Sequence, residues 1–208
     1  MEIQYQEIKN IEKKLLSYPE AKLLIVTKNR PQALVIELIQ KGHQCFGENR
    51  VQEAHSKYFE ILNENISLHL IGPLQTNKTK IALELFDTIQ TIDRPKLVNE
   101  ISKYKKDNIR TKDFYIQVNI GQEPQKAGVP AKFAKDLYKL CVDKNLSISG
   151  LMCIPPANHN PSQFFKEMIN LRNNINSKLK LSMGMSDDFE IALEHQSNMI
   201  RVGSLLFK

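Results

Sequence analysis

Short apolar runs alternate with amphipathic stretches along almost the whole chain. The runs are rich in Ile, Val and Leu, which is typical of strands that are buried on both faces of a parallel sheet. They cover residues 22–27, 44–47, 67–71, 88–92, 113–120, 147–154, 179–183 and 198–202. Eight such runs, each separated from the next by a helical pattern, predict a parallel α/β fold, and the eightfold repeat favours a closed (β/α)8 barrel of the TIM type over an open sheet.

Helical patterns lie between the predicted strands. The first of them starts at Pro31, which suits the first helical turn, and stops before Gly42, a favourable helix end. The full set covers residues 31–41, 49–63, 77–85, 95–106, 130–144, 162–178 and 187–195. A further helix is expected at residues 3–17, and the chain stops at Lys208, just past the last strand. We therefore expect one domain, residues 1–208, in which the N-terminal helix covers the barrel next to the last strand and no C-terminal β-domain follows.

Composition excludes several classes of protein. Hydrophobic residues make up 41% and charged residues 25% of the chain, as in ordinary globular proteins. No apolar run reaches the ~18 residues that span a bilayer, and the N-terminus lacks the apolar core of a secretory signal. Cys45, Cys141 and Cys153 are scattered and form no C-x-x-C pair, which argues against a disulfide framework or a cysteine-built zinc site. These features predict a cytoplasmic protein that does not insert into membranes.

The net charge of +6 raises the question of nucleic-acid binding. The lysines are dispersed, however, and aromatic residues make up only 7% of the chain. The tightest cluster is Lys103, Lys105 and Lys106 at the end of a predicted helix, where cations suit the helix dipole. A solvated basic surface is therefore favoured over a nucleic-acid interface.

Lys28 follows the apolar strand LLIVT. The active sites of such barrels lie at the carboxyl ends of the strands, so its amine is expected near the barrel mouth. Partial burial there would favour a neutral amine, which can attack an aldehyde and form a Schiff base. A surface lysine that merely follows a strand is the alternative.

The last two strands are followed by small polar residues. Residues 182–186 and Gly203-Ser204 stand where barrels often build phosphate sites from backbone N–H groups, glycine and serine hydroxyls. Ordinary turn chemistry explains the same residues about as well. Arg201, inside the last strand, could face a cofactor ring, and Asn49 could hydrogen-bond a polar edge of the ligand. Glu48 is more simply explained as an acid in the first turn of a helix.

Histidines give no sign of a metal centre. His69 lies within the third predicted strand and is interpreted as an interior histidine with satisfied hydrogen bonds. The other histidines, His43, His55, His159 and His195, share no metal-ligand spacing. No metal is predicted.

Several segments together resemble the pyridoxal phosphate homeostasis protein family. The similarity runs from about residue 22 to the C-terminus, in the family's order. It is carried by residues 25–28 (IVTK), 46–53 (FGENRVQE), 69–78 (HLIGPLQTNK), 117–120 (QVNI), 126–128 (KAG), 150–156 (GLMCIPP), 181–188 (LSMGMSDD) and 199–204 (MIRVGS). One departure is Thr27-Lys28-Asn29, where the family often has Ser-Lys-Thr; it leaves the lysine intact.

The resemblance implies a fold-type III barrel that binds pyridoxal 5′-phosphate (PLP), like the N-terminal domain of alanine racemase. It implies that Lys28 is the Schiff-base lysine and that Arg201 lies near the pyridine nitrogen. The cofactor-binding residues that we predict are Lys28, Asn49, Ser182, Ser186, Arg201, Gly203 and Ser204. No catalytic residue is predicted.

The function that the resemblance implies is homeostasis of PLP: buffering the aldehyde and delivering it to apo-enzymes, without established catalysis. A racemase-like enzyme acting on amino acids is the alternative, although the chain has no length left for a racemase's second domain. The lack of that dimer-building domain also favours a monomer.

Overall fold

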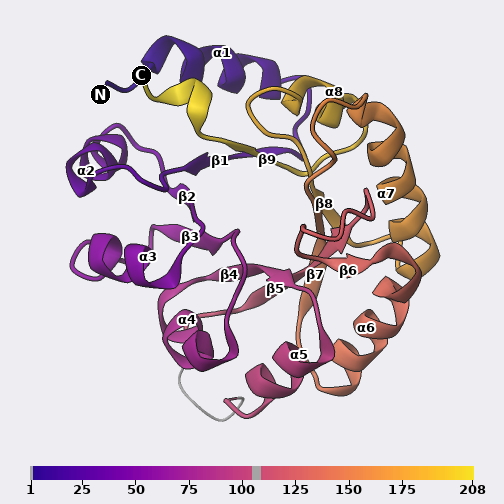
Figure 1. Ribbon diagram of the computed structural model, residues 1–208. Coiled ribbons are helices and arrows are strands. Elements are labelled where there is room, and N and C mark those ends of the chain that lie inside the picture. The colour runs from indigo at the N-terminus through magenta and orange to yellow at the C-terminus, as the bar shows by residue number, and fades with distance from the viewer. Residues whose placement is uncertain (1, 105–108) are drawn as a thin grey trace.

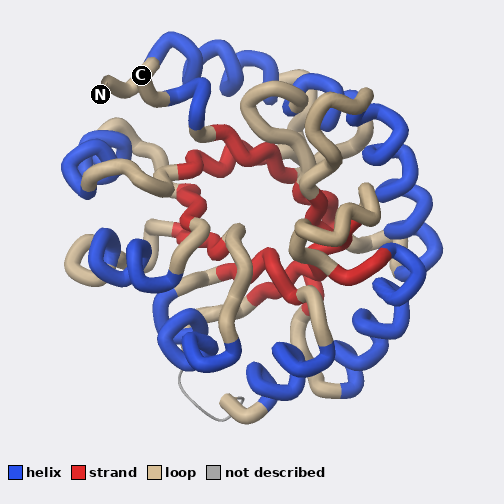
Figure 2. Tube along the Cα trace, in the orientation of Figure 1, coloured by secondary structure: helices blue, strands red, loops and turns tan. Residues whose placement is uncertain are grey.

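Parallel strands form a closed barrel within a ring of helices (Figures 1 and 2). The structure is a computed structural model, and it describes residues 2–104 and 109–208. Within these residues the barrel has eight strands: β1 (Lys22–Val26), β2 (Cys45–Glu48), β3 (Ser67–Leu70), β4 (Thr88–Ile92), β5 (Asp113–Asn119), β7 (Ile148–Cys153), β8 (Lys180–Ser182) and β9 (Met199–Val202). The predicted TIM-type barrel is confirmed, and each strand end lies within one residue of its predicted position.

Strand order determines which loops meet at the barrel mouth. Neighbouring strands run in the order β4-β3-β2-β1-β9-β8-β7-β5, and pairing of β4 with β5 closes the barrel. Ile25 of β1 pairs with Val202 of β9, and Val26 pairs with Gly47 of β2. Because neighbouring strands are only about 4.8 Å apart, residues that follow β8, β9, β1 and β2 share one sector of the mouth.

A short strand that we did not predict lies outside the barrel wall. In β6 (Val129–Pro130), Val129 pairs with Val118 of β5. Its two residues carry too little pattern to be recognised as a strand. It extends the mouth side of β5 without changing the closure of the barrel.

Helices cover the outside of the barrel. They are α1 (Tyr5–Leu15), α2 (Gln32–Gln40), α3 (Val51–Tyr58), α4 (Thr79–Leu85), α5 (Pro95–Ser102), α6 (Ala131–Asp143), α7 (Pro161–Ile175) and α8 (Phe189–Glu194), with 3-10 turns at Thr76–Lys78 and Ser204–Leu206. The predicted helix 49–63 is too long, since α3 stops at Tyr58 and Asn63 accepts the Asn65 N–H in a local turn instead. Lys105 and Lys106, at the end of predicted helix 95–106, lie outside the described residues.

The hydrophobic core lies between the strands and the helices. Outward-facing strand residues such as Phe46, Leu68 and Leu181 are fully buried there. The barrel interior is different: a small apolar cluster, Leu24 with Val26 and Met199, shares it with buried polar side chains. An interior with polar groups is able to support a binding site.

The N-terminal helix covers the barrel where β9 ends, as predicted. Ile8 and Ile11 of α1 are buried, and α1 contacts β1 and the turn Ser204–Leu206. The two chain ends lie side by side (Figure 1). There the Lys208 N–H donates to the Glu2 carbonyl at 3.1 Å, and Ile3 forms an antiparallel bridge with Phe207.

Cys45, Cys141 and Cys153 are free thiols. Within residues 2–104 and 109–208, no helix combines the length and the apolar character needed to cross a membrane.

Candidate functional site

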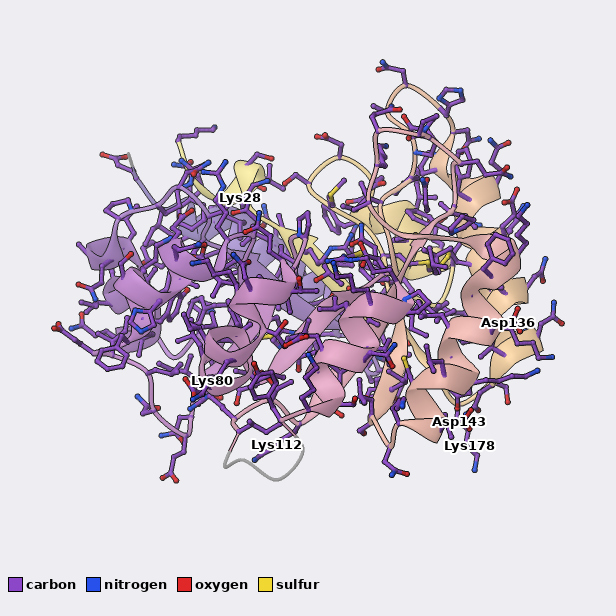
Figure 3. The ribbon with its side chains drawn as sticks, turned by 60° about the horizontal axis from the view of Figure 1, so that its bottom comes forward. Lys28, Lys80, Lys112, Asp136, Asp143 and Lys178 are labelled. Carbon is purple, nitrogen blue, oxygen red and sulfur yellow. The ribbon has the colours of Figure 1, made fainter. Side chains whose placement is uncertain are left out.

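Lys28 lies at the carboxyl end of β1, on the barrel mouth. Figure 3 shows it on one side of the molecule, whereas Lys112 and Lys178, which precede β5 and β8, lie on the opposite side. Thr27 before it is fully buried, and Asn29 after it has a φ of 58°. The expected partial burial of Lys28 is wrong, because its side chain extends past the end of the strand and is exposed.

Gly203 packs against the strand that carries Lys28. A Cβ atom at Gly203 would lie 3.0 Å from both the Cβ and the carbonyl oxygen of Val26. This close approach follows from the pairing of Ile25 with Val202. The loop after β9 is therefore held beside the turn that contains Lys28.

Two serines join the loops that follow β8 and β9. The hydroxyl of Ser204 donates to the hydroxyl of Ser186 at 2.9 Å, and the Leu205 N–H lies 3.3 Å from the same Ser186 oxygen. Ser186 is half-buried and Ser204 is exposed. Hydroxyls and N–H groups on small residues are suitable donors for a phosphate.

Arg201 points into the barrel below this loop. It is 3% exposed, and it donates to the Ser182 hydroxyl and the Cys153 carbonyl, both at 2.8 Å. Burial lowers the pKa of its guanidinium. The structure therefore brings Ser182 together with Arg201 in the interior, and not with Ser186 and Ser204 on the rim.

A chain of hydrogen bonds continues from Ser182 across the barrel. The Ser182 hydroxyl donates to Gln90 Oε1 at 2.7 Å, and Gln90 Nε2 lies 2.9 Å from His69 Nδ1. His69 Nε2 in turn lies 2.9 Å from the hydroxyl of Ser67. Burial, with a smaller effect of the Lys22 charge, lowers the pKa of His69 to about 3. The interpretation of His69 as a satisfied interior histidine is confirmed.

Gln90 is a site residue that the sequence analysis missed. It is fully buried, and it connects the partner of Arg201 to His69. A polar glutamine in the middle of the apolar strand TIQTI was the available signal. Such a residue in a strand buried on both faces needs hydrogen-bond partners inside the barrel.

Asn49 follows β2 and carries an unused acceptor. Its Oδ1 atom is buried, and no described residue hydrogen-bonds it. Gly72 holds the residue in place, since a Cβ there would lie 2.1 Å from the Asn49 carbonyl oxygen. Asn49 also lines a cavity of about 460 Å³ with Gln52 and Gln75. A buried acceptor beside a cavity at the mouth is available for a donor on a ligand.

The interpretation of Glu48 as an acid in the first turn of a helix is wrong, because Glu48 ends β2. Its side chain is fully buried on the outer face of β2, where Lys57 and Thr27 bind it. The described residues contain no group of three or more His, Cys, Asp or Glu side chains able to hold a metal ion.

The sequence matches a family model over most of its length. The model described as alanine racemase, N-terminal domain, matches residues 5–208. The pyridoxal phosphate homeostasis protein of Aquifex aeolicus is 37% identical over 196 residues, which cover 90% of this chain and 86% of the relative. The chain belongs to the pyridoxal phosphate homeostasis protein family. The resemblance seen in its motifs is thereby confirmed.

Solved structures agree with this assignment. PipY of Synechococcus elongatus PCC7942, with PLP bound, has a TM-score of 0.80 and 31% identity, covering 91% of this chain and 93% of that one. The alanine racemase of Clostridium difficile 630 has a TM-score of 0.71 at 13% identity, covering 89% of this chain and 52% of that one. The second comparison shows the fold alone.

The residues present fit PLP by their chemistry. Lys28 supplies a primary amine beside the loop after β9, whose Ser204 hydroxyl bonds the Ser186 hydroxyl of the loop after β8. Gly203 leaves room that a side chain would fill, and in the part of the chain that the structure describes no donor reaches the buried Asn49 Oδ1. These groups complement PLP: the amine matches its aldehyde, the hydroxyl and N–H donors match its phosphate, and the Asn49 acceptor matches its hydroxyl group.

Proposed function

We propose that this protein binds PLP through Lys28 and serves PLP homeostasis by buffering the cofactor and delivering it to apo-enzymes. The observation that carries the proposal is the packing of Gly203 against Val26, which holds a loop suited to phosphate beside the Lys28 turn. The names of the relatives and the PLP-bound state of PipY support the same ligand.

PLP supplies an aldehyde, and the Lys28 nitrogen replaces the aldehyde oxygen, which leaves as water with both amine protons. Other residues of the protein bind the phosphate and a polar edge of the ligand. Ser186 and Ser204 donate hydrogen bonds to the phosphate, with Gly203 allowing close approach. Asn49 accepts a hydrogen bond from the ligand. Because the linkage is reversible, the reactive aldehyde is kept from other amines yet stays available.

Borohydride reduction of the PLP-loaded protein, followed by peptide mass spectrometry, tests this proposal. We expect a phosphopyridoxyl mass on the peptide that contains Lys28, and loss of that label in Lys28→Ala. Lys22→Ala is the matched control, because Lys22 starts the same strand at the opposite end of the barrel. Label on another peptide, or none in the wild type, would refute the assignment to Lys28.

We infer a carrier rather than an enzyme. Arg201, a buried cation held by Ser182 and Cys153, would lie beside the ring and oppose protonation of its nitrogen. A ring that stays unprotonated is a weaker electron sink. The similarity of the fold to alanine racemase motivates the competing hypothesis of an amino-acid racemase. Exchange of the α-hydrogen of alanine for solvent deuterium by the loaded protein would support that hypothesis, and we expect none.

Further aspects of the function stay predictions. Apo-enzymes that depend on PLP are the proposed recipients, and a monomer is the proposed state. Cytoplasmic location and the absence of nucleic-acid binding rest on composition and charge distribution. Light scattering and a salt titration with a mixed oligonucleotide would test the monomer and the lack of nucleic-acid binding.

A further inference from the structure

A buried ionic cluster lies behind the turn that carries Lys28. Lys57 of α3 is 6% exposed and Glu48 of β2 is fully buried, and the Lys57 Nζ atom lies 2.7 Å from Glu48 Oε1. Glu53, one helical turn before Lys57, forms a second ion pair with it at 3.0 Å. Such a cluster is costly to bury, since charged groups lose hydration.

The cluster binds the main chain on both sides of Lys28. Lys57 Nζ donates to the Thr27 carbonyl at 2.7 Å, and Glu53 Oε1 accepts the Asn29 N–H. The Thr27 carbonyl belongs to the peptide bond before Lys28, and the Asn29 N–H belongs to the one after it. Both peptide groups of Lys28 are therefore fixed, while its side chain is exposed.

Further contacts hold the Thr27 side chain. Its hydroxyl lies 2.7 Å from both Glu48 Oε1 and the hydroxyl of Tyr58. An ammonium group has three N–H donors, and the Thr27 carbonyl, Glu48 and Glu53 use those of Lys57. Loss of Lys57 would therefore remove its bonds to the Thr27 carbonyl, Glu48 and Glu53 at once.

The positive charge of Lys57 stabilises the ionised forms of the Glu48 and Glu53 carboxylates. Burial raises the pKa of Glu48 in spite of its hydrogen bonds from Lys57 and Thr27. Glu48 Oε2 has no hydrogen-bond partner among residues 2–104 and 109–208. For Glu53, burial also raises the pKa, but hydrogen bonds from Lys57 and the Asn29 N–H outweigh it and hold the pKa below its ordinary value. Without Lys57, two acidic side chains would face each other with no cation between them.

We propose that Lys57, together with Glu48 and Glu53, is a positioning cluster that holds the main chain of Lys28 so that its amine reaches the PLP aldehyde. The inference rests on the proposed function. The cluster acts through the Lys28 backbone and touches no part of the cofactor, so it governs bond formation at Lys28 rather than docking of the phosphate.

Stopped-flow mixing of the apo-protein with PLP separates these two effects. Absorbance of the Schiff base gives a rate at saturating PLP and a half-saturating concentration. For Lys57→Met we expect the saturating rate to fall about tenfold or more, because small misplacements of a reacting group have large kinetic effects. The half-saturating concentration should stay within about twofold, since Ser186, Gly203 and Ser204 are unchanged.

Arg110→Met is the matched control. Arg110 pairs with Asp87 at 3.0 Å and donates to the Ile66 carbonyl at 2.8 Å, so it also combines an ion pair with a main-chain contact. It anchors the segment that enters β3, at the end of the barrel opposite the mouth. We expect Arg110→Met to lose thermal stability yet keep the wild-type rate. The induced circular dichroism of bound PLP should likewise change in Lys57→Met alone, because that signal reports the orientation of the linkage.

If Lys57→Met does not fold, Glu53→Ala provides the test. The Glu53 side chain is 22% exposed, so its removal leaves less unpaired charge in the core than Lys57→Met does. We expect a several-fold slower rate at saturating PLP. A folded Lys57→Met or Glu53→Ala that reacts at the wild-type rate overturns the positioning role, while Lys28 labelling in the wild type keeps the proposed function. A wild type that forms no Schiff base on Lys28 overturns both.

Discussion

Gln90 and His69 lie in the barrel interior, where their side chains form a hydrogen bond with each other. Gln90 Nε2 donates to His69 Nδ1, so the ring proton of the neutral imidazole belongs on Nε2, which faces Ser67. The donors then point in one direction, from Arg201 through Ser182 and Gln90 to His69. Each residue in this chain is oriented by the next, so a single substitution affects its neighbours.

Replacement of Gln90 by leucine should lower the free energy of unfolding by about 1–3 kcal/mol, because the Ser182 hydroxyl and His69 Nδ1 would each lose a buried partner. Urea denaturation measures the change. Gln6→Leu is the control, because Gln6 is exposed on α1 and its amide donates to the neighbouring Asn10 side chain. Equal stability of Gln90→Leu and Gln6→Leu would contradict the interior network.

His69 should make stability depend on pH. Folding keeps its imidazole neutral down to a pKa of about 3, whereas the ordinary histidine pKa is 6.5. Between these values the unfolded state binds the extra proton, so stability falls as the pH falls from 6.5 towards 3. The wild type should lose up to about 1.4 kcal/mol per pH unit more than His69→Gln below pH 6. Urea titrations from pH 7.5 to 4.5 measure this difference.

The control for this pH dependence is His159→Gln, because the His159 side chain is exposed. It should keep the wild-type slope. Parallel slopes for the wild type and His69→Gln would show that His69 is protonated in the folded state.

Among the elements, α1 closes the gap beside the last strand. Its buried face packs on the sheet at β1, and the adjacent N-terminal residues pair with the chain end. The helix therefore supports the two strands, β1 and β9, that present Lys28 and Gly203. Periodicity predicted this helix well, since Ile8 and Ile11 recur at a helical spacing.

Ile8→Ala should cost about 2–5 kcal/mol of unfolding free energy, because Ile8 is 1% exposed and its truncation leaves a cavity. Lys9→Ala, on the exposed side of the same helix, should change stability by less than about 0.5 kcal/mol. Chemical denaturation of both variants measures the difference. Similar values for the two would mean that α1 does not stabilise the barrel.

For the whole molecule, barrel closure is what assembles the site. Strands β1 and β9 lie far apart in the chain, and their pairing brings the loops after β8 and β9 beside those after β1 and β2. Ligand binding should therefore stabilise the entire fold, since the site exists only when the barrel is closed.

PLP at about a hundred times its dissociation constant should add about 2.7 kcal/mol to stability. Thermal unfolding with and without PLP measures this gain. Lys28→Ala keeps Ser186, Gly203 and Ser204, so it should retain only a smaller part of the gain. Inorganic phosphate in place of PLP is the control for docking without the covalent link. An identical shift in the wild type and Lys28→Ala would show that Lys28 contributes nothing to binding.

Local sequence patterns predicted the elements and the ends of the strands. The apolar runs, Pro31 with Gly42, and the placement of Lys28 just after a strand each depend on neighbours within a few residues. The bounds of α3 and the short β6 were missed, because a turn at Asn63 and two paired residues leave almost no pattern. Burial of Glu48 was missed for a similar reason: a carboxylate is exposed unless a distant cation reaches it.

The sequence by itself determined that the chain is a β/α repeat with an amine at the end of its first strand and small polar residues after its last two. Those properties follow from side-chain periodicity and turn chemistry, which act over short stretches of chain. Only the tertiary structure decided that Gly203 packs on Val26, that Gln90 meets both Ser182 and His69, and that Lys57 holds the peptides beside Lys28. These contacts join residues far apart in the chain, and closure of the barrel brings them within hydrogen-bond distance.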